Sequence, residues 1–191
     1  FDLKKVITLL IKSIKYYWAI IVSSTISIII GNYAKIYSFL NLSESETTKI
    51  SLFLRLLMIL QLIHASYTGY YLKEIFGDAK RTYSKKIFIN YLILMVIFSL
   101  IIILIVSTYS SLIELNVKLD LIFFCIYFYV FFWCLAAYFE QYINKFNKNI
   151  SILYNNIISI TLYFLILFSF NETSLLSLSI TMMVSSMIYL I

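Results

Sequence analysis

The chain has 191 residues, of which 62% are hydrophobic and 13% are charged, and its mean hydropathy is +0.95. Soluble domains carry about 25% charged residues, so this chain has too few charges to cover a surface that faces water. It has only three glycines and no phosphate-binding glycine loop, which excludes a nucleotide site of the usual kind. These properties indicate a single membrane-embedded domain over residues 1–191.

The first 15 residues have the pattern of an amphipathic helix. On a helical projection Lys4, Lys5, Lys12 and Lys15 fall on one side, and apolar residues occupy the opposite side. We predict an interfacial helix on the inner leaflet, with its lysines toward anionic head groups. A secretory signal peptide is the alternative, and the lack of a small-residue cleavage site before a soluble domain disfavours it.

Six apolar segments follow, and a helix needs about 20 such residues to cross the hydrocarbon of a bilayer. They cover residues 16–33, 51–71, 87–108, 121–139, 150–170 and 174–191. The third segment contains no charged residue, and the complete absence of proline fits uninterrupted helices. We therefore predict an all-α integral membrane protein with six transmembrane helices, preceded by the interfacial helix.

The distribution of basic residues predicts the orientation, because cytoplasmic segments accumulate lysine and arginine. With the N-terminus inside, eleven basic residues lie in cytoplasmic segments: Lys4, Lys5, Lys12, Lys15, Lys73, Lys80, Arg81, Lys85, Lys86, Lys145 and Lys148. Three lie in outer segments: Lys35, Lys49 and Lys118. We predict that both ends are cytoplasmic. The abundance of Ile, Asn, Lys, Tyr and Phe is typical of an AT-rich genome, so we expect a multi-pass protein of a bacterial plasma membrane.

The second predicted span contains polar residues at helical spacing. Gln61, His64 and Thr68 form one stripe on an otherwise apolar helix. Polar side chains inside a span face either protein or a water-filled path, so the stripe lines a substrate path or forms hydrogen bonds between helices. Arg55, nearer the outer end, is expected to reach the outer interface or to pair with an acidic residue of the preceding loop.

The fourth predicted span is half aromatic along its whole length, which exceeds an interfacial belt. Tyr127 and Trp133 are candidates to line a substrate path, with bulky packing as the alternative. In the fifth span, Asn155 and Asn156 are predicted to hydrogen-bond between helices.

The sequence offers no catalytic or metal-binding constellation. His64 is the only histidine, so a histidine cluster has no second member. Cys125 and Cys134 lie nine positions apart, on nearly opposite helix faces, and are interpreted as small buried hydrophobic residues. No acidic residue lies deep in a predicted span. We therefore expect neither enzymatic activity, a bound metal or cofactor, nor nucleic-acid binding from this chain.

The longest predicted cytoplasmic connection, residues 72–86, mixes acidic with basic residues and has an amphipathic pattern. Its charged residues include Glu74, Asp78, Lys80, Arg81, Lys85 and Lys86. A short surface helix of this kind could present its charges to a cytoplasmic partner.

This layout resembles the permease of a type-2 ATP-binding-cassette exporter. Such permeases have an amphipathic elbow helix, six spans and a coupling helix before the third span, where Glu74 and the run Arg81–Ile87 are similar to the usual pattern. The resemblance implies two permease subunits paired with two ATPase subunits, which would bind the ATP. It also implies that the connection containing Glu74 and Lys86 docks on the ATPase. The small outer loops favour an amphipathic peptide or a lipid as the exported substrate.

Two other classes remain open. One is a non-transporting membrane protein, such as an immunity protein or an accessory subunit of a larger complex, for which the absence of a firm site is expected. The other is a vitamin-uptake binding subunit, which has a similar length and number of spans but relies on small residues that are scarce here.

Overall fold

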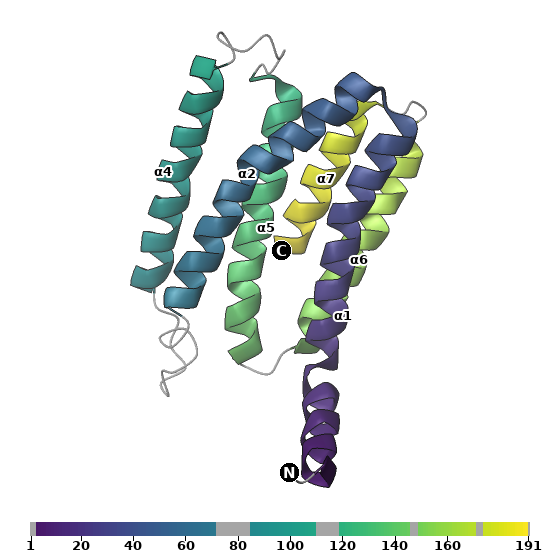
Figure 1. Cartoon of the computed structure of the whole chain (residues 1–191), viewed down its shortest axis with the longest axis vertical. Coiled ribbons are helices and arrows are strands. Elements are labelled where there is room, and N and C mark those ends of the chain that lie inside the picture. The colour runs from purple at the N-terminus through teal and green to yellow at the C-terminus, as the bar shows by residue number, and fades with distance from the viewer. Residues whose placement is uncertain (1–2, 72–84, 110–118, 146–148, 171–173, 191) are drawn as a thin grey trace.

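The computed structural model describes residues 3–71, 85–109, 119–145, 149–170 and 174–190. Six helices account for nearly all of these residues, and the described part of the chain contains no strand. The helices are α1 (Leu3–Asn41), α2 (Glu44–Tyr70), α4 (Lys85–Tyr109), α5 (Leu121–Lys145), α6 (Asn149–Ser169) and α7 (Leu175–Leu190). The prediction of an all-α fold is confirmed (Figure 1).

Within the described residues, four helices are long and apolar enough to cross a membrane: α2, α4, α5 and α6. They indicate a membrane-embedded protein, as the composition predicts. The apolar helix α7 has 16 residues and is shorter than a typical span. The helix that contains the fourth predicted span, α5, continues beyond residue 139 to Lys145.

The N-terminal boundary predicted at residue 15 is not confirmed. The predicted interfacial segment and the first predicted span belong to one helix, α1, of 39 residues. A helix of this length is about 58 Å long, which exceeds the roughly 30 Å of bilayer hydrocarbon. The N-terminal part of α1 accordingly extends beyond the other helices (Figure 1).

The helices run alternately up and down along the long axis (Figure 1). The most extensive interface joins α5 to α7, and α7 packs on its other side against α6. Helix α1 packs against α6, while α2 packs against α5 and α4 lies outside α2. Helices α1 and α2 meet at the top of the molecule and diverge toward the bottom (Figure 1).

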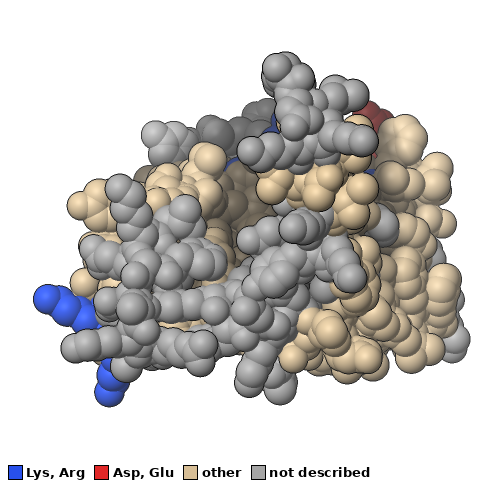
Figure 2. Space-filling model, turned by 90° about the horizontal axis from the view of Figure 1, so that it is seen from below, with Lys and Arg blue, Asp and Glu red and all other residues tan. Residues whose placement is uncertain are grey.

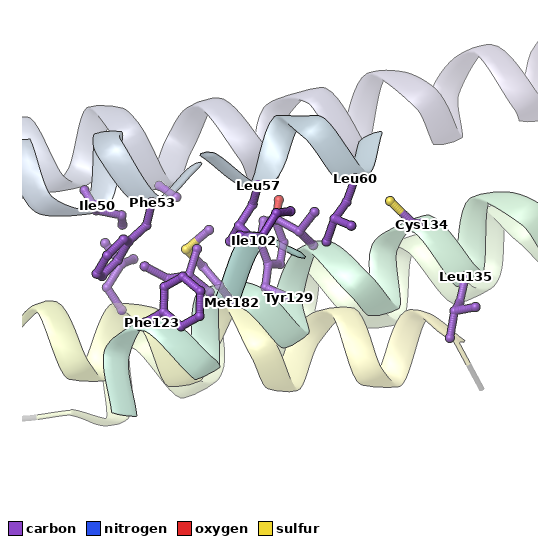
Figure 3. Packing of buried hydrophobic residues seen from close by; sticks show 14 of the residues in the cluster. Ile50, Phe53, Leu57, Leu60, Ile102, Phe123, Tyr129, Cys134, Leu135 and Met182 are labelled. Carbon is purple, nitrogen blue, oxygen red and sulfur yellow. The ribbon is translucent and has the colours of Figure 1, made fainter. Parts of the chain in front are cut away.

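The core is built on one face of α2. Ile50, Phe53, Leu57 and Leu60 recur at helical spacing, are completely buried and point toward α5 and α7 (Figure 3). The ring of Phe53 meets Phe123 of α5 edge-to-face, with ring centroids 5.2 Å apart. This apolar stripe fixes which side of α2 faces the rest of the bundle.

Helix α7 is buried although it is rich in hydroxyl side chains. Ser179 and Thr181 are fully buried and donate hydrogen bonds to the backbone carbonyls of Leu175 and Ser177, at 2.7 and 2.8 Å. Their polar atoms are therefore satisfied within the helix, and the small size of these side chains lets α5 and α6 approach α7 closely. This explains how α7 occupies the space between two larger helices.

Candidate functional site

An open cavity of about 610 Å³ lies between α1, α2, α5 and α7, beneath the point where α1 and α2 diverge. Its volume falls within the range of about 300–1,000 Å³ that is typical of small-molecule sites. It is lined by Asn32, Lys35, Ser51, Leu54, Arg55, Met58, Gln61, Tyr129, Trp133, Ala137, Glu140, Met182 and Tyr189. Seen from below, the molecule is hollowed near its centre (Figure 2).

The wall formed by α1 and α2 carries five polar side chains beside Leu54 and Met58. Asn32 and Lys35 come from α1, and Ser51, Arg55 and Gln61 come from α2. The described part of the chain supplies none of these five side chains with a hydrogen-bond or ion-pair partner. Polar groups in an apolar surrounding need water or a ligand to replace their lost hydration. This wall therefore has binding capacity that the described residues do not use.

The wall formed by α5 and α7 carries one carboxylate that is hydrogen-bonded. The Tyr189 hydroxyl of α7 donates to Oε1 of Glu140, and Nδ2 of Asn156 in α6 lies 3.4 Å from the same oxygen. Nδ2 of Asn156 also lies 3.3 Å from the Tyr189 hydroxyl. These contacts confirm that Asn156 hydrogen-bonds between helices.

Glu140 lies one position beyond the fourth predicted span, near the C-terminal end of α5. Because α5 continues, Glu140 belongs to the apolar stretch Leu121–Ile143 that is long enough to cross a membrane. An ionisable residue inside a span is a candidate functional group in its own right.

A much smaller cavity of about 20 Å³ shares the lining residues Tyr129, Trp133 and Tyr189 with the large one. Ser159 and Ser185 contribute hydroxyl groups to its lining, and Ser159 Oγ is buried without a hydrogen-bond partner in the described part of the chain. This volume accommodates one water molecule, which could satisfy the Ser159 hydroxyl.

The predicted polar stripe of α2 divides between two environments. Gln61 lines the large cavity, whereas His64 and Thr68 lie on the buried face of the helix. The Tyr91 hydroxyl donates to the carbonyl of Cys134 at 3.1 Å, so His64 Nδ1, 2.8 Å away, is the donor to that hydroxyl. His64 thus joins α2 to α4 and α5, as the packing interpretation of the stripe requires.

Thr68 and Tyr127 contact neither cavity. The Thr68 hydroxyl donates to the carbonyl of His64 at 2.8 Å, within its own helix. The Tyr127 ring is stacked with Phe131, with ring centroids 5.8 Å apart. Trp133 does line both cavities, and its ring centroid lies 6.3 Å from that of His64. Of the five residues predicted to line a substrate path, Gln61 and Trp133 share the large cavity.

The proposed coupling connection lies largely outside the described residues, including Glu74, Asp78, Lys80 and Arg81. Lys85 and Lys86 begin α4 and are exposed. Basic side chains project at the lower left in Figure 2, the side on which α4 lies.

Within the described residues, no group of three or more His, Cys, Asp or Glu side chains could hold a metal ion. Cys125 and Cys134 are free and buried. No protein-family model, curated protein or solved structure matches this chain.

Sequence reasoning missed most of the residues that line the cavity. Arg55 is the single charged residue of the second predicted span, and its side chain was expected to reach the outer interface or to pair with a carboxylate of the preceding loop. Glu46 is instead engaged in the capping box of Ser43, and Arg55 lines the cavity. The signal that could have been used is the spacing of Ser51, Arg55, Met58 and Gln61, whose steps of four, three and three residues place them along one stripe of the helix.

Proposed function

We propose that this chain is a membrane-embedded transport subunit, and that the large cavity holds an amphipathic substrate during its passage. The observation that carries this proposal is a cavity that combines polar side chains lacking a partner among the described residues with apolar side chains that include Trp133 and Met182. Such a cavity inside an apolar helical bundle has the chemistry of a path for a molecule that is partly polar.

The membrane arrangement we propose has six spans, α1, α2, α4, α5, α6 and α7, with both ends in the cytoplasm. The alternating helix directions support it, since α2 ends and α4 begins at the end of the bundle where α1 begins (Figure 1). The excess of basic residues in the segments at this end supports a cytoplasmic location for it.

The energy source in this proposal is an ATPase on a separate chain, which docks at residues 72–86 as in type-2 ATP-binding-cassette exporters. The exposed pair Lys85 and Lys86 at the start of α4 supports such a docking surface. The permease would act as a pair, formed with a second copy or with a related subunit.

Purification of the native complex in mild detergent, followed by identification of every subunit by mass spectrometry, tests the assignment. A stoichiometric nucleotide-binding ATPase is the expected result. Charge reversal at both Lys85 and Lys86 should then release the ATPase, while the same change at Lys118, in a predicted outer segment, should not. A chain that purifies without any ATPase would overturn the exporter assignment.

A non-transporting accessory subunit is the second candidate function. It is favoured by the hydrogen bonds of His64 and Glu140, which join helices within the bundle and so serve packing. Co-purification with membrane subunits that lack an ATPase would identify this class, and a tightly bound small molecule would instead favour a vitamin-uptake subunit.

A further inference from the structure

The charges around the large cavity are distributed unequally. Lys35 and Arg55 lie on the α1–α2 wall, and Glu140 lies on the opposite wall. Glu140 accepts hydrogen bonds from Tyr189 and Asn156, whereas no described acidic residue forms an ion pair with either cation. Within the part of the chain that the structure describes, the two cations therefore have no acidic partner.

The depths of Lys35 and Arg55 along their helices differ by about 7 Å, a difference that the two long side chains can span. Lys35 lies six residues before the end of α1, and Arg55 lies eleven residues after the start of α2. At 1.5 Å per residue, these positions are about 9 Å and about 16 Å below the turn that joins the two helices. One small anionic group can therefore approach both side chains within the same cavity.

The remainder of the cavity has a different chemistry. Leu54, Met58, Trp133, Ala137 and Met182 provide an apolar lining next to the cations. A ligand composed only of polar groups would leave this surface without a complementary partner, and a purely apolar ligand would leave both cations desolvated and unpaired. The lining fits a molecule with one charged end and one apolar chain.

We infer that the cavity binds a single-chain amphiphile with one anionic head group, a carboxylate or a phosphate. The head group lies between Lys35 and Arg55, and the chain packs against Met58, Trp133 and Met182. Arginine favours both head groups because its guanidinium forms paired hydrogen bonds with their oxygens. This inference rests on the same cavity as the proposed transport function and specifies the substrate class.

Quenching of Trp133 fluorescence by a brominated chain tests the inference. The chain has two tryptophans, so a Trp18→Phe background leaves Trp133 as the single reporter. The purified full-length protein in an uncharged detergent is titrated with dibrominated stearic acid and with the methyl ester of the same acid. The two probes differ only in charge, and we expect the acid to bind at least about tenfold more tightly.

Amino-acid substitutions test whether Lys35 and Arg55 cause the tighter binding of the acid. Replacing both Lys35 and Arg55 by glutamine should abolish the difference between acid and ester, whereas Arg55→Lys should retain most of it. Replacing both Lys85 and Lys86 by glutamine removes the same charge far from the cavity and should leave the preference unchanged. The single variant Lys35→Gln, at an exposed position, provides a second measurement if the double variant does not fold.

Equal quenching by acid and ester would overturn the inference. It would also be overturned if the two double variants lost the preference for the acid to the same extent. Competition by dodecyl phosphate and by lauric acid, each against the brominated acid, distinguishes a phosphate from a carboxylate as the preferred head group. Acid-selective binding in a chain that has no ATPase partner would retain this inference while rejecting the exporter. An ATPase complex without acid-selective binding would reject the substrate class alone.

Discussion

Asp120 joins the start of α5 to α2 through an ion pair with Lys49. Its Oδ2 contacts Nζ of Lys49, and its Oδ1 accepts a hydrogen bond from the backbone nitrogen of Phe123 at 2.9 Å. One carboxylate thus caps a helix and links two helices at the same end of the bundle. Both side chains are partly exposed, so the cap should contribute more than the ion pair.

We predict that Asp120→Ala lowers the free energy of unfolding by about 1–3 kcal/mol, because it removes the cap together with the ion pair. Asparagine caps helices as well as aspartate does, so Asp120→Asn should cost at most about 1 kcal/mol. Unfolding in detergent micelles, followed by circular dichroism, measures both values. Equal losses in the two variants would show that the cap is not the larger contribution.

A second prediction concerns the hydrogen bonds of Tyr91, which is completely buried. Tyr91→Phe removes the partner of His64 Nδ1 and of the Cys134 carbonyl, so the variant should lose about 1–2 kcal/mol of stability. Tyr154→Phe makes the same chemical change on an exposed face of α6 and should have little effect. Thermal unfolding of the two variants provides the comparison, and equal stabilities would contradict a structural role for this contact.

A third prediction tests whether water reaches the large cavity. In a background with both native cysteines replaced by alanine, Gln61→Cys should react with a charged, membrane-impermeant thiol reagent in proteoliposomes at least about tenfold faster than Leu62→Cys. Leu62 is 64% exposed but does not line the cavity, so in a bilayer we expect it to face lipid. Labelling at position 62 that is as fast as at position 61 would mean that the cavity is not a separate aqueous compartment.

The fourth prediction concerns the space around α7. Ser179 is fully buried, and its replacement by leucine adds volume to α7, which packs against both α5 and α6. We expect Ser179→Leu to lose about 1–3 kcal/mol of stability through overpacking. The matched variant Ser66→Leu, at an exposed position of α2, should be nearly neutral. A neutral Ser179→Leu, measured by the same thermal unfolding assay, would show that α7 is packed more loosely than its burial indicates.

Periodicity and hydropathy predicted the existence and approximate bounds of α2, α4, α5, α6 and α7, because the length of an apolar run reports directly on helix formation. The ends of the helices were harder to predict from the sequence. The polar residues after position 139 concealed the continuation of α5, and with it the role of Glu140.

The cavity could not be predicted because it depends on how helices diverge. Hydropathy shows that Arg55 and Gln61 interrupt an apolar helix, yet both lie beside a buried stripe that begins at Ile50. Whether such residues face lipid, protein or a cavity is decided by the distance between α1 and α2, which no local pattern encodes. The contact of His64 with Tyr91 likewise joins residues 27 positions apart.

The side-chain caps described for three of the helices gather at one end of the bundle. Ser43 and Glu46 cap α2, Asp120 caps α5, and the hydroxyls of Ser174 and Ser177 accept from each other's backbone nitrogens at the start of α7. All three starts lie at the end where α1 and α2 meet (Figure 1). Each of these side chains satisfies backbone nitrogens in the first turn of its helix, so we expect the caps to suppress fraying of all three helices at this one end of the bundle.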